Sequence, residues 1–184
     1  MKTLLPPRRE TGAALIVSLV LLLVMTLIGL TAMRQNVLEE RMAGASMERN
    51  SAMQLAEAAL RDAETWLDNQ LLPPSPSGAG PTDVWAQMAP ENVFGPFVPF
   101  SQWTDANWAG APLWNYGQRT GAANLPNTTT PPRYVIEQWA YNEIDEEKRK
   151  KGMGEFHYRI TAHSQGPAGN ARVTLQINVP KIFK

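Results

Sequence analysis

An uncharged apolar run near the amino terminus restricts the possible folds of this chain more than any other stretch. From Ala13 to Met33 the sequence has 21 residues and no charged side chain. A helix rises about 1.5 Å per residue, so this run extends about 31 Å, close to the thickness of a bilayer hydrocarbon core. We therefore predict that residues 13–33 form a single transmembrane helix.

The residues in front of this run determine its orientation. They carry three basic side chains and one acidic side chain, so the positive-inside rule places residues 1–12 in the cytoplasm and the rest of the chain across the membrane. A cleaved secretory signal would have a shorter apolar region followed by a small-residue cleavage site. Here the residues after Met33 do not form such a site, and Gly12 lies directly before the run. A plain signal anchor with a fortuitous glycine is the alternative interpretation.

The helical pattern continues beyond the membrane segment, because apolar residues recur at spacings of three and four through residues 34–71. Polar residues such as Glu57, Arg61 and Asp62 lie between them. Pro73 ends the pattern, since proline cannot continue a helix. We predict one helix of about 58 residues, transmembrane over 13–33 and amphipathic over 34–71. The apolar stripe consists of Leu38, Met42, Ala45, Ala52, Leu55, Ala56, Ala59, Leu60, Ala63, Trp66 and Leu67.

Residues 72–133 have a different composition, with 11 of the 15 prolines and four of the six tryptophans. A loop of this length is uncommon in a compact domain unless it is functional or disordered, and its aromatic content argues against disorder. We predict a folded, largely irregular layer with short helical or strand pieces near residues 83–88 and 101–109. Most of the tryptophans are expected in the core, where large side chains anchor a loop without disulfides. A ligand or partner site formed by the tryptophans is the alternative.

The periodicity changes to two in the last part of the chain. Residues 134–141 are rich in strand formers, and apolar and polar residues alternate over 156–163 and 171–179. We predict that residues 134–184 form an antiparallel meander with one apolar face, which the amphipathic half of the helix covers. The predicted fold class is α+β, with residues 34–184 as one globular unit.

Two groups of polar residues could suggest a metal site. His157 and His163 lie on the same face of a predicted strand, but six residues of strand separate them by about 20 Å, too far to share one ion. We predict that this face is solvated. The acidic residues in the charged loop 142–154 lack the alternating spacing of a calcium loop, so we predict a solvated loop that could serve as a contact edge.

Composition excludes several classes of function. The chain has no cysteine, which excludes disulfides, thiol catalysis and cysteine metal sites. It has no basic stripe of the kind that binds nucleic acid. A serine–histidine–acid set, a phosphate loop and a carboxylate pair beside an apolar pocket are not recognisable in it. We predict a structural protein that is not an enzyme and that needs no cofactor.

Several short segments resemble one family. They are Gly12-Ala13-Ala14-Leu15-Ile16-Val17, Leu27-Ile28-Gly29-Leu30, Leu38-Glu39-Glu40-Arg41-Met42-Ala43-Gly44, Ala56-Glu57-Ala58-Ala59-Leu60-Arg61, Tyr158-Arg159-Ile160-Thr161-Ala162 and Ala171-Arg172-Val173-Thr174-Leu175-Gln176. Together with the order of leader, long helix, loop region and meander, these segments resemble the PilX group of type IV pilus minor pilins. The resemblance covers the helix and the last two strands, whereas residues 72–133 carry no motif of that group.

The resemblance implies a prepilin leader. Prepilin peptidase would cleave between Gly12 and Ala13 and methylate the new amine of Ala13. Major pilins carry a glutamate at the fifth mature position, which is Val17 here. The missing charge suggests a subunit at or near the pilus tip, which need not dock beneath another subunit. The resemblance further implies a minor pilin that takes part in priming type IV pilus assembly, and so in fimbrium biogenesis, cell adhesion and twitching motility.

The implied partners are other minor pilins, the major pilin, a PilY-type tip adhesin, prepilin peptidase and inner membrane lipid. Before assembly, the protein would be a single-pass inner membrane protein with its carboxyl-terminal domain in the periplasm. Two alternatives remain open. One is a type II secretion pseudopilin, whose tip member also lacks the glutamate. The other is a membrane-anchored binding protein or enzyme that never polymerises.

Overall fold

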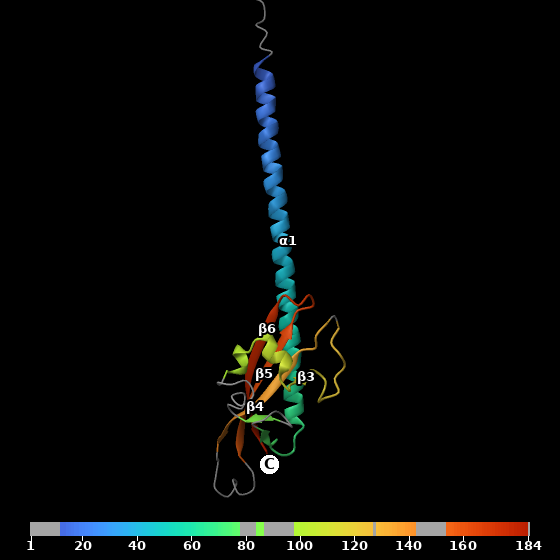
Figure 1. The fold of residues 1–184 in the computed structure, drawn as a ribbon, viewed down its shortest axis with the longest axis vertical. Coiled ribbons are helices and arrows are strands. Elements are labelled where there is room, and N and C mark those ends of the chain that lie inside the picture. The colour runs from blue at the N-terminus through green and yellow to red at the C-terminus, as the bar shows by residue number, and fades with distance from the viewer. Residues whose placement is uncertain (1–11, 78–83, 87–97, 127, 143–153, 184) are drawn as a thin grey trace, which may run out of the picture. The chain divides into compact units, whose positions relative to one another are not determined.

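The computed structural model describes residues 12–77, 84–86, 98–126, 128–142 and 154–183 (Figure 1). Its first element is α1, Ala13–Asp68, a continuous helix of 56 residues that confirms the predicted long helix. The chain has two compact units, residues 1–45 and residues 46–184, and α1 contributes to both.

In the first unit, α1 carries exposed apolar side chains and is long and apolar enough to cross a membrane. Ser18, Thr26 and Thr31 each donate a hydroxyl hydrogen bond to a carbonyl three residues earlier, at 2.8–2.9 Å. A hydroxyl without a partner is costly in hydrocarbon, where no water can replace the bond. These bonds therefore make the three polar residues compatible with a bilayer.

The second unit contains a mixed six-stranded sheet in the part of the chain that the structure describes. The strands are β1 (Pro76–Ser77), β2 (Val84–Ala86), β3 (Trp114–Asn115), β4 (Arg133–Asn142), β5 (Glu155–Gln165) and β6 (Arg172–Ile182). The three long strands β4, β5 and β6 form the predicted antiparallel meander. The pairs β1–β2 and β2–β4 are parallel, which the sequence did not predict. Strands of two or three residues are too short to show a period of two.

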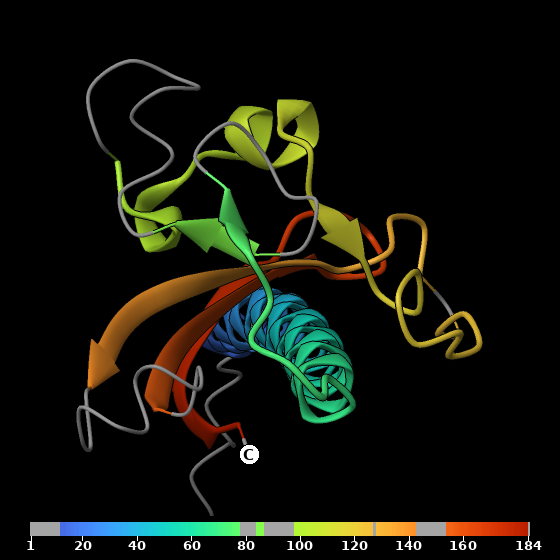
Figure 2. The same ribbon diagram turned by 90° about the horizontal axis from the view of Figure 1, so that it is seen from below.

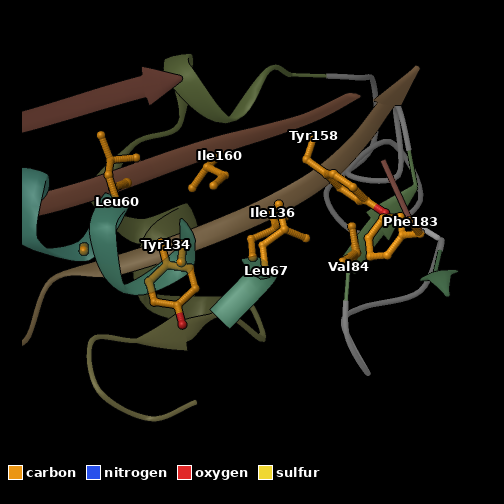
Figure 3. Packing of buried hydrophobic residues seen from close by; sticks show 11 residues of the cluster. Leu60, Leu67, Val84, Tyr134, Ile136, Tyr158, Ile160 and Phe183 are labelled. Atoms are coloured by element: carbon orange, nitrogen blue, oxygen red, sulfur yellow. The ribbon is translucent and has the colours of Figure 1, made fainter. Parts of the chain in front are cut away.

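The carboxyl-terminal part of α1 packs on one face of this sheet. Ala59 and Ala63 have no exposed surface, and their small side chains allow the helix to approach the strands closely. Leu67 of α1 lies with Ile136 of β4 and Ile160 of β5 in this core (Figure 3). The amphipathic half of the helix thus covers the meander, as predicted.

The buried positions of α1 differ from the predicted stripe in two ways. The buried positions begin at Ala52, whereas Leu38, Met42 and Ala45 are exposed in the single chain. The predicted stripe was therefore wrong at its amino-terminal end. Asp62, expected among the polar residues, is only 5% exposed. Periodicity shows which face of a helix is apolar, but it contains no information on where a packed sheet begins.

The other face of the sheet is also covered, which corrects the prediction of a single apolar face (Figure 2). The covering segment includes η1 (Phe100–Gln102) and α3 (Asp105–Gly110), close to the predicted short pieces. Its aromatic residues Phe100, Trp103 and Trp108 form a second buried cluster with Ala111, Trp85 of β2 and Val135 of β4. The sheet is therefore the middle layer of three in the second unit.

α3 has a well-formed start. Thr104 accepts a hydrogen bond from the backbone N–H of Asn107, and the Asn107 side chain accepts one from the backbone N–H of Thr104 at 3.0 Å. This reciprocal capping satisfies two backbone donors that the first turn leaves without partners. It fixes a helix of only six residues, which would not be stable alone.

Candidate functional site

The predicted processing junction lies at the start of α1. Gly12 is exposed, and Ala13 is the first residue of the helix. Val17 is 57% exposed and lies about 6 Å further along the helix axis. Free backbone N–H groups and the helix dipole make this end positive, so the helix itself offers no compensation for an amine on Ala13. Val17 supplies no carboxylate either. Cleavage before Ala13 and methylation of its amine remain predictions.

In the second unit, Asp62 of α1 anchors the loop that follows β3. Its Oδ2 accepts a hydrogen bond from the backbone N–H of Gly117 at 3.0 Å, and its Oδ1 accepts one from the Thr120 hydroxyl. Gly117 has φ +75°, and a Cβ at this position would lie 2.3 Å from the carbonyl oxygen of Ala122. The loop conformation therefore requires glycine at this position, and the buried carboxylate holds it against the helix.

Asp62 also affects a neighbour in the core. Burial raises the pKa of Tyr134 above its ordinary value, and the negative charge of Asp62 raises it further. The Tyr134 hydroxyl therefore stays neutral at physiological pH. One sequence signal pointed to the burial of Asp62, which is that this residue adjoins the alanine positions that face the sheet.

Arg119 from the same loop makes a second contact with α1. Its guanidinium lies 3.6 Å from the ring centre of Trp66 on α1 and 3.9 Å from that of Trp114 on β3. A guanidinium stacked between two indoles gains cation–π attraction on both faces. Trp66 and Trp114 are thus structural clamps in this unit.

A buried ion pair lies on the outer face of the sheet. Glu137 of β4 is fully buried, and Arg159 of β5 donates to both of its carboxylate oxygens, at 2.8 and 3.0 Å. Trp139 covers the guanidinium at 3.7 Å from its ring centre and is itself 40% exposed. Burial raises the pKa of Glu137, and the hydrogen bonds and charge of Arg159 oppose that rise. The ion pair with Arg159 compensates the free-energy cost of burying the Glu137 carboxylate.

Two further contacts tie α1 to the ends of β6. The turn between β5 and β6 docks on α1 through Glu48, whose Oε1 accepts from the backbone N–H of Asn170 at 2.9 Å. At the other end of β6, Lys181 donates to the carbonyl of Leu67 and lies 3.6 Å from Asp68. A cation there complements the negative carboxyl-terminal end of the helix.

The prediction of a solvated face fails for one of the two histidines. His157 is partly exposed beside Asn142 and Glu155. His163 is only 8% exposed, because α3 covers this part of the outer face, so the prediction of a solvated face was wrong there. Within the described residues there is no group of three side chains that could hold a metal ion. The charged loop predicted over 142–154 lies outside the described residues between 143 and 153.

The tryptophans mostly follow the prediction. Trp85, Trp103 and Trp108 are buried, and Trp66 and Trp114 are partly buried against the core. Their alternative use as an open ligand surface is therefore not supported at these positions. Their packing explains how a proline-rich region forms a layer without disulfides.

The geometry of the second unit is that of a scaffold. In it, hydrogen bonds and cation–π contacts attach the sheet and the loop after β3 to the long helix. Two family models match this chain. The PilX N-terminal model matches residues 11–61, and the model described as type IV pilus assembly protein PilX C-term matches residues 48–181. Neither a curated protein nor a solved structure gives a significant match. With two matches that together extend from residue 11 to residue 181, the chain belongs to the PilX family of type IV pilus assembly proteins.

Proposed function

We propose that this protein is a minor pilin that takes part in priming type IV pilus assembly and occupies a position at or near the pilus tip. Membership of the PilX family gives it a role in pilus assembly. The observation that carries the finer proposal is the junction at α1, where Gly12 precedes the first helical residue and an uncharged Val17 occupies the fifth position, at which major pilins carry a glutamate. The role is structural, without catalysis.

The proposed mechanism depends on charge at the amino-terminal end of α1. A subunit with a glutamate at the position of Val17 can compensate the amine of a neighbour inside the fibre, where both charges are buried. Val17 cannot do so, but it also avoids the cost of inserting a carboxylate into the bilayer, about 2.5–3.5 kcal/mol at the centre of a span. Such a subunit can start a fibre from the membrane without docking beneath another subunit.

Association of the membrane helices would then depend on shape. Helices in lipid associate through van der Waals contact and small residues, since lipid is as apolar as their side chains. Ser18, Gly29, Thr31 and Ala32 are exposed small residues on α1 in the first unit. We propose that they form the contacts with the spans of other minor pilins and of the major pilin. A PilY-type adhesin is the proposed partner of the assembled tip.

The leader is tested by Gly12→Val. In cells with prepilin peptidase, this variant should keep the size of the uncleaved chain, because a β-branched side chain replaces the glycine before the cleaved bond. Gly29→Val is the matched control, since Gly29 lies in open space within α1 and its variant should still be cleaved. Processing of Gly12→Val to the size of the mature chain would show that the leader assignment is wrong.

The tip position is tested by Val17→Glu. The added carboxylate should allow this subunit to dock beneath another one, so that gold-labelled antibody finds it along the fibre as well as at its end. Val17→Leu, which adds no charge, should stay at the end. An unchanged distribution and an unchanged set of co-purified partners for Val17→Glu would contradict a tip role defined by this residue.

Co-purification separates the proposed function from the alternatives. Detergent extracts of membranes should yield a stoichiometric complex of this chain with other type IV minor pilins, together with a PilY-type protein. A complex with type II secretion components would instead support a pseudopilin. A free monomer would support a membrane-anchored protein that never polymerises.

A further inference from the structure

Residues 98–113, which we call the strap, dock on the outer face of the sheet through one titratable side chain. The ring of Trp108 in α3 stacks on the imidazole of His163 in β5, with the ring centres 5.0 Å apart and the planes inclined by 12°. Trp108 is 2% exposed and belongs to the buried cluster that joins the strap to the sheet. His163 therefore forms part of the sheet surface that contacts the strap.

Polar contacts surround this imidazole on its edges. Its Nδ1 lies 3.0 Å from Thr174 Oγ1 on β6, and its Nε2 lies 3.5 Å from Asp105 Oδ1 in α3, which is longer than a normal hydrogen bond. Asp105 instead accepts a close contact from Arg172 of β6, with 2.6 Å between Oδ2 and Nε. The carboxylate that could stabilise an imidazolium is thus already paired with a guanidinium.

Charges from every neighbouring element act on His163. Asp105 of α3 contributes one negative charge, whereas Arg172 of β6 and Arg133 of β4 contribute two positive charges. Arg133 also donates to the carbonyl of Trp108, so it lies where the strap meets the sheet. A cavity of about 70 Å³ is lined by Asp105, Arg133 and His163, among others. Burial lowers the pKa of His163, Asp105 opposes this effect, and the two arginines lower the pKa further.

We propose that the strap is a latch that is closed while His163 is neutral and released when His163 takes up a proton. An imidazolium has two N–H donors and a full charge, and in the docked state this charge would be buried beneath the strap, near the guanidiniums of Arg172 and Arg133. Undocking of the strap brings His163 into water and removes that cost. Release would uncover the aromatic side chains of Phe100, Trp103 and Trp108 and the sheet residue Val135, which are now buried together. This inference does not depend on the proposed pilus role.

The sign of the pH dependence follows from the direction of the shift. The docked state holds the proton on His163 less tightly than the open state, in which water solvates the imidazole and its pKa lies closer to the ordinary value of about 6.5. The docked state is therefore fully favoured above pH 6.5, and it loses that advantage as the pH falls below 6.5 towards the lowered pKa. Between pH 7.5 and 5.5 the equilibrium constant for opening should rise up to about tenfold.

Few other groups can produce this change. The chain has only two histidines, and carboxyl groups with ordinary pKa values titrate below this window. Glu137 has a raised pKa and lies in β4 on the same face of the sheet. Its effect has the opposite sign, because an acid with a raised pKa in the folded state favours that state as the pH falls. A loss of docking on acidification is therefore attributed to one of the two histidines, and substitution of His157 and of His163 shows which one.

The test is amide hydrogen exchange of the full chain in detergent micelles at pH 7.5, 6.5 and 5.5, corrected for intrinsic exchange rates. The reporter amides are those of Trp108 and Ala111, which donate to the carbonyls of Thr104 and Asn107 within α3. The opening constant at these amides should rise up to about tenfold towards pH 5.5, while amides of β5 stay protected. His163→Gln, which cannot titrate, should show no such rise. His157→Gln is the matched control and should behave like the wild type.

A pH-independent opening constant in the wild type, or an acid-induced rise that persists in His163→Gln, would overturn the proposal. If His163→Gln does not fold, NMR titration of the wild type still decides the question. The chain has two imidazole signals, and His157→Gln identifies the signal of His163. A midpoint for His163 at or above pH 6.5 would exclude a latch that requires the neutral ring, and a lower midpoint that coincides with strap opening would support it.

Discussion

Replacing Arg159 by methionine tests how much the buried ion pair contributes to this fold. Glu137 is fully buried, and the Arg159 side chain is 14% exposed and donates to both carboxylate oxygens. Removing one partner leaves a buried charge without compensation, which costs about 3–5 kcal/mol. We therefore expect Arg159→Met to lower the free energy of unfolding by about that amount at pH 7.5, measured by urea unfolding with tryptophan fluorescence in detergent.

The pH dependence of Arg159→Met gives a second check. Burial raises the pKa of Glu137, and Arg159 opposes this rise, so the pKa should be higher in the variant than in the wild type. An acid with a raised pKa in the folded state binds its proton more tightly there than in the unfolded chain. The stability of the variant should therefore increase relative to the wild type as the pH falls from 7.5 to 5.5, by at most about 1.4 kcal/mol per pH unit.

Two controls decide whether the reasoning holds. Glu137→Leu combined with Arg159→Met removes both charges and should recover most of the stability, because an apolar pair of similar volume can replace a buried ion pair. Arg61→Met removes an exposed arginine that lies 3.7 Å from Glu57 and should change stability by less than about 0.5 kcal/mol. A loss below about 1 kcal/mol for Arg159→Met, or a double variant as unstable as the single one, would refute the assigned role.

Three further changes address the packing of α1, each measured by the same unfolding assay. Asp62→Ala should destabilise the second unit by about 1–3 kcal/mol, because the donors of Gly117 and Thr120 lose their buried acceptor; a loss under about 0.5 kcal/mol would show that water replaces it. Gly117→Ala should cost about 1–3 kcal/mol, since φ is +75° and the new Cβ meets a backbone oxygen at 2.3 Å; wild-type stability would contradict the required left-handed conformation. Ala59→Leu should cost about 1–3 kcal/mol by overpacking a side chain with no exposed surface, whereas Ala43→Leu, at an exposed position of α1, should be nearly neutral.

The long helix and the meander were predictable because their signals are local. An uncharged run and a stripe at spacings of three and four define a helix, and Pro73 defines its end, so the predicted and observed helices differ by only a few residues. Alternation over β5 and β6 defined two strands with one apolar face towards α1. The signal for the leader junction is also local, since Gly12 directly precedes the run and Val17 is its fifth residue, and the junction stays a prediction.

The outer layer was not predictable in the same way. His163 occupies a position that alternates correctly for an exposed face, whereas Glu137 lies in a strand without clear alternation. Both are buried because the strap and β2 lie over or beside them. The pairing of β2 shows the same limit, because a strand of three residues paired in parallel with β4 has no pattern of its own. The covering contacts join residues far apart in the chain, and no local spacing encodes them.

The sequence was sufficient to predict the long apolar helix, its amphipathic continuation and the three long strands. It was also sufficient for the family resemblance, which the two family matches confirm. Each of these depends on periodicity or on adjacent residues. Which polar residues are buried, and what they bind, became known from the folded chain alone. Asp62 holds a loop 55 residues away, Glu137 pairs with Arg159, and His163 supports the strap. Desolvation depends on what covers a side chain, and here the covering residues come from distant parts of the chain.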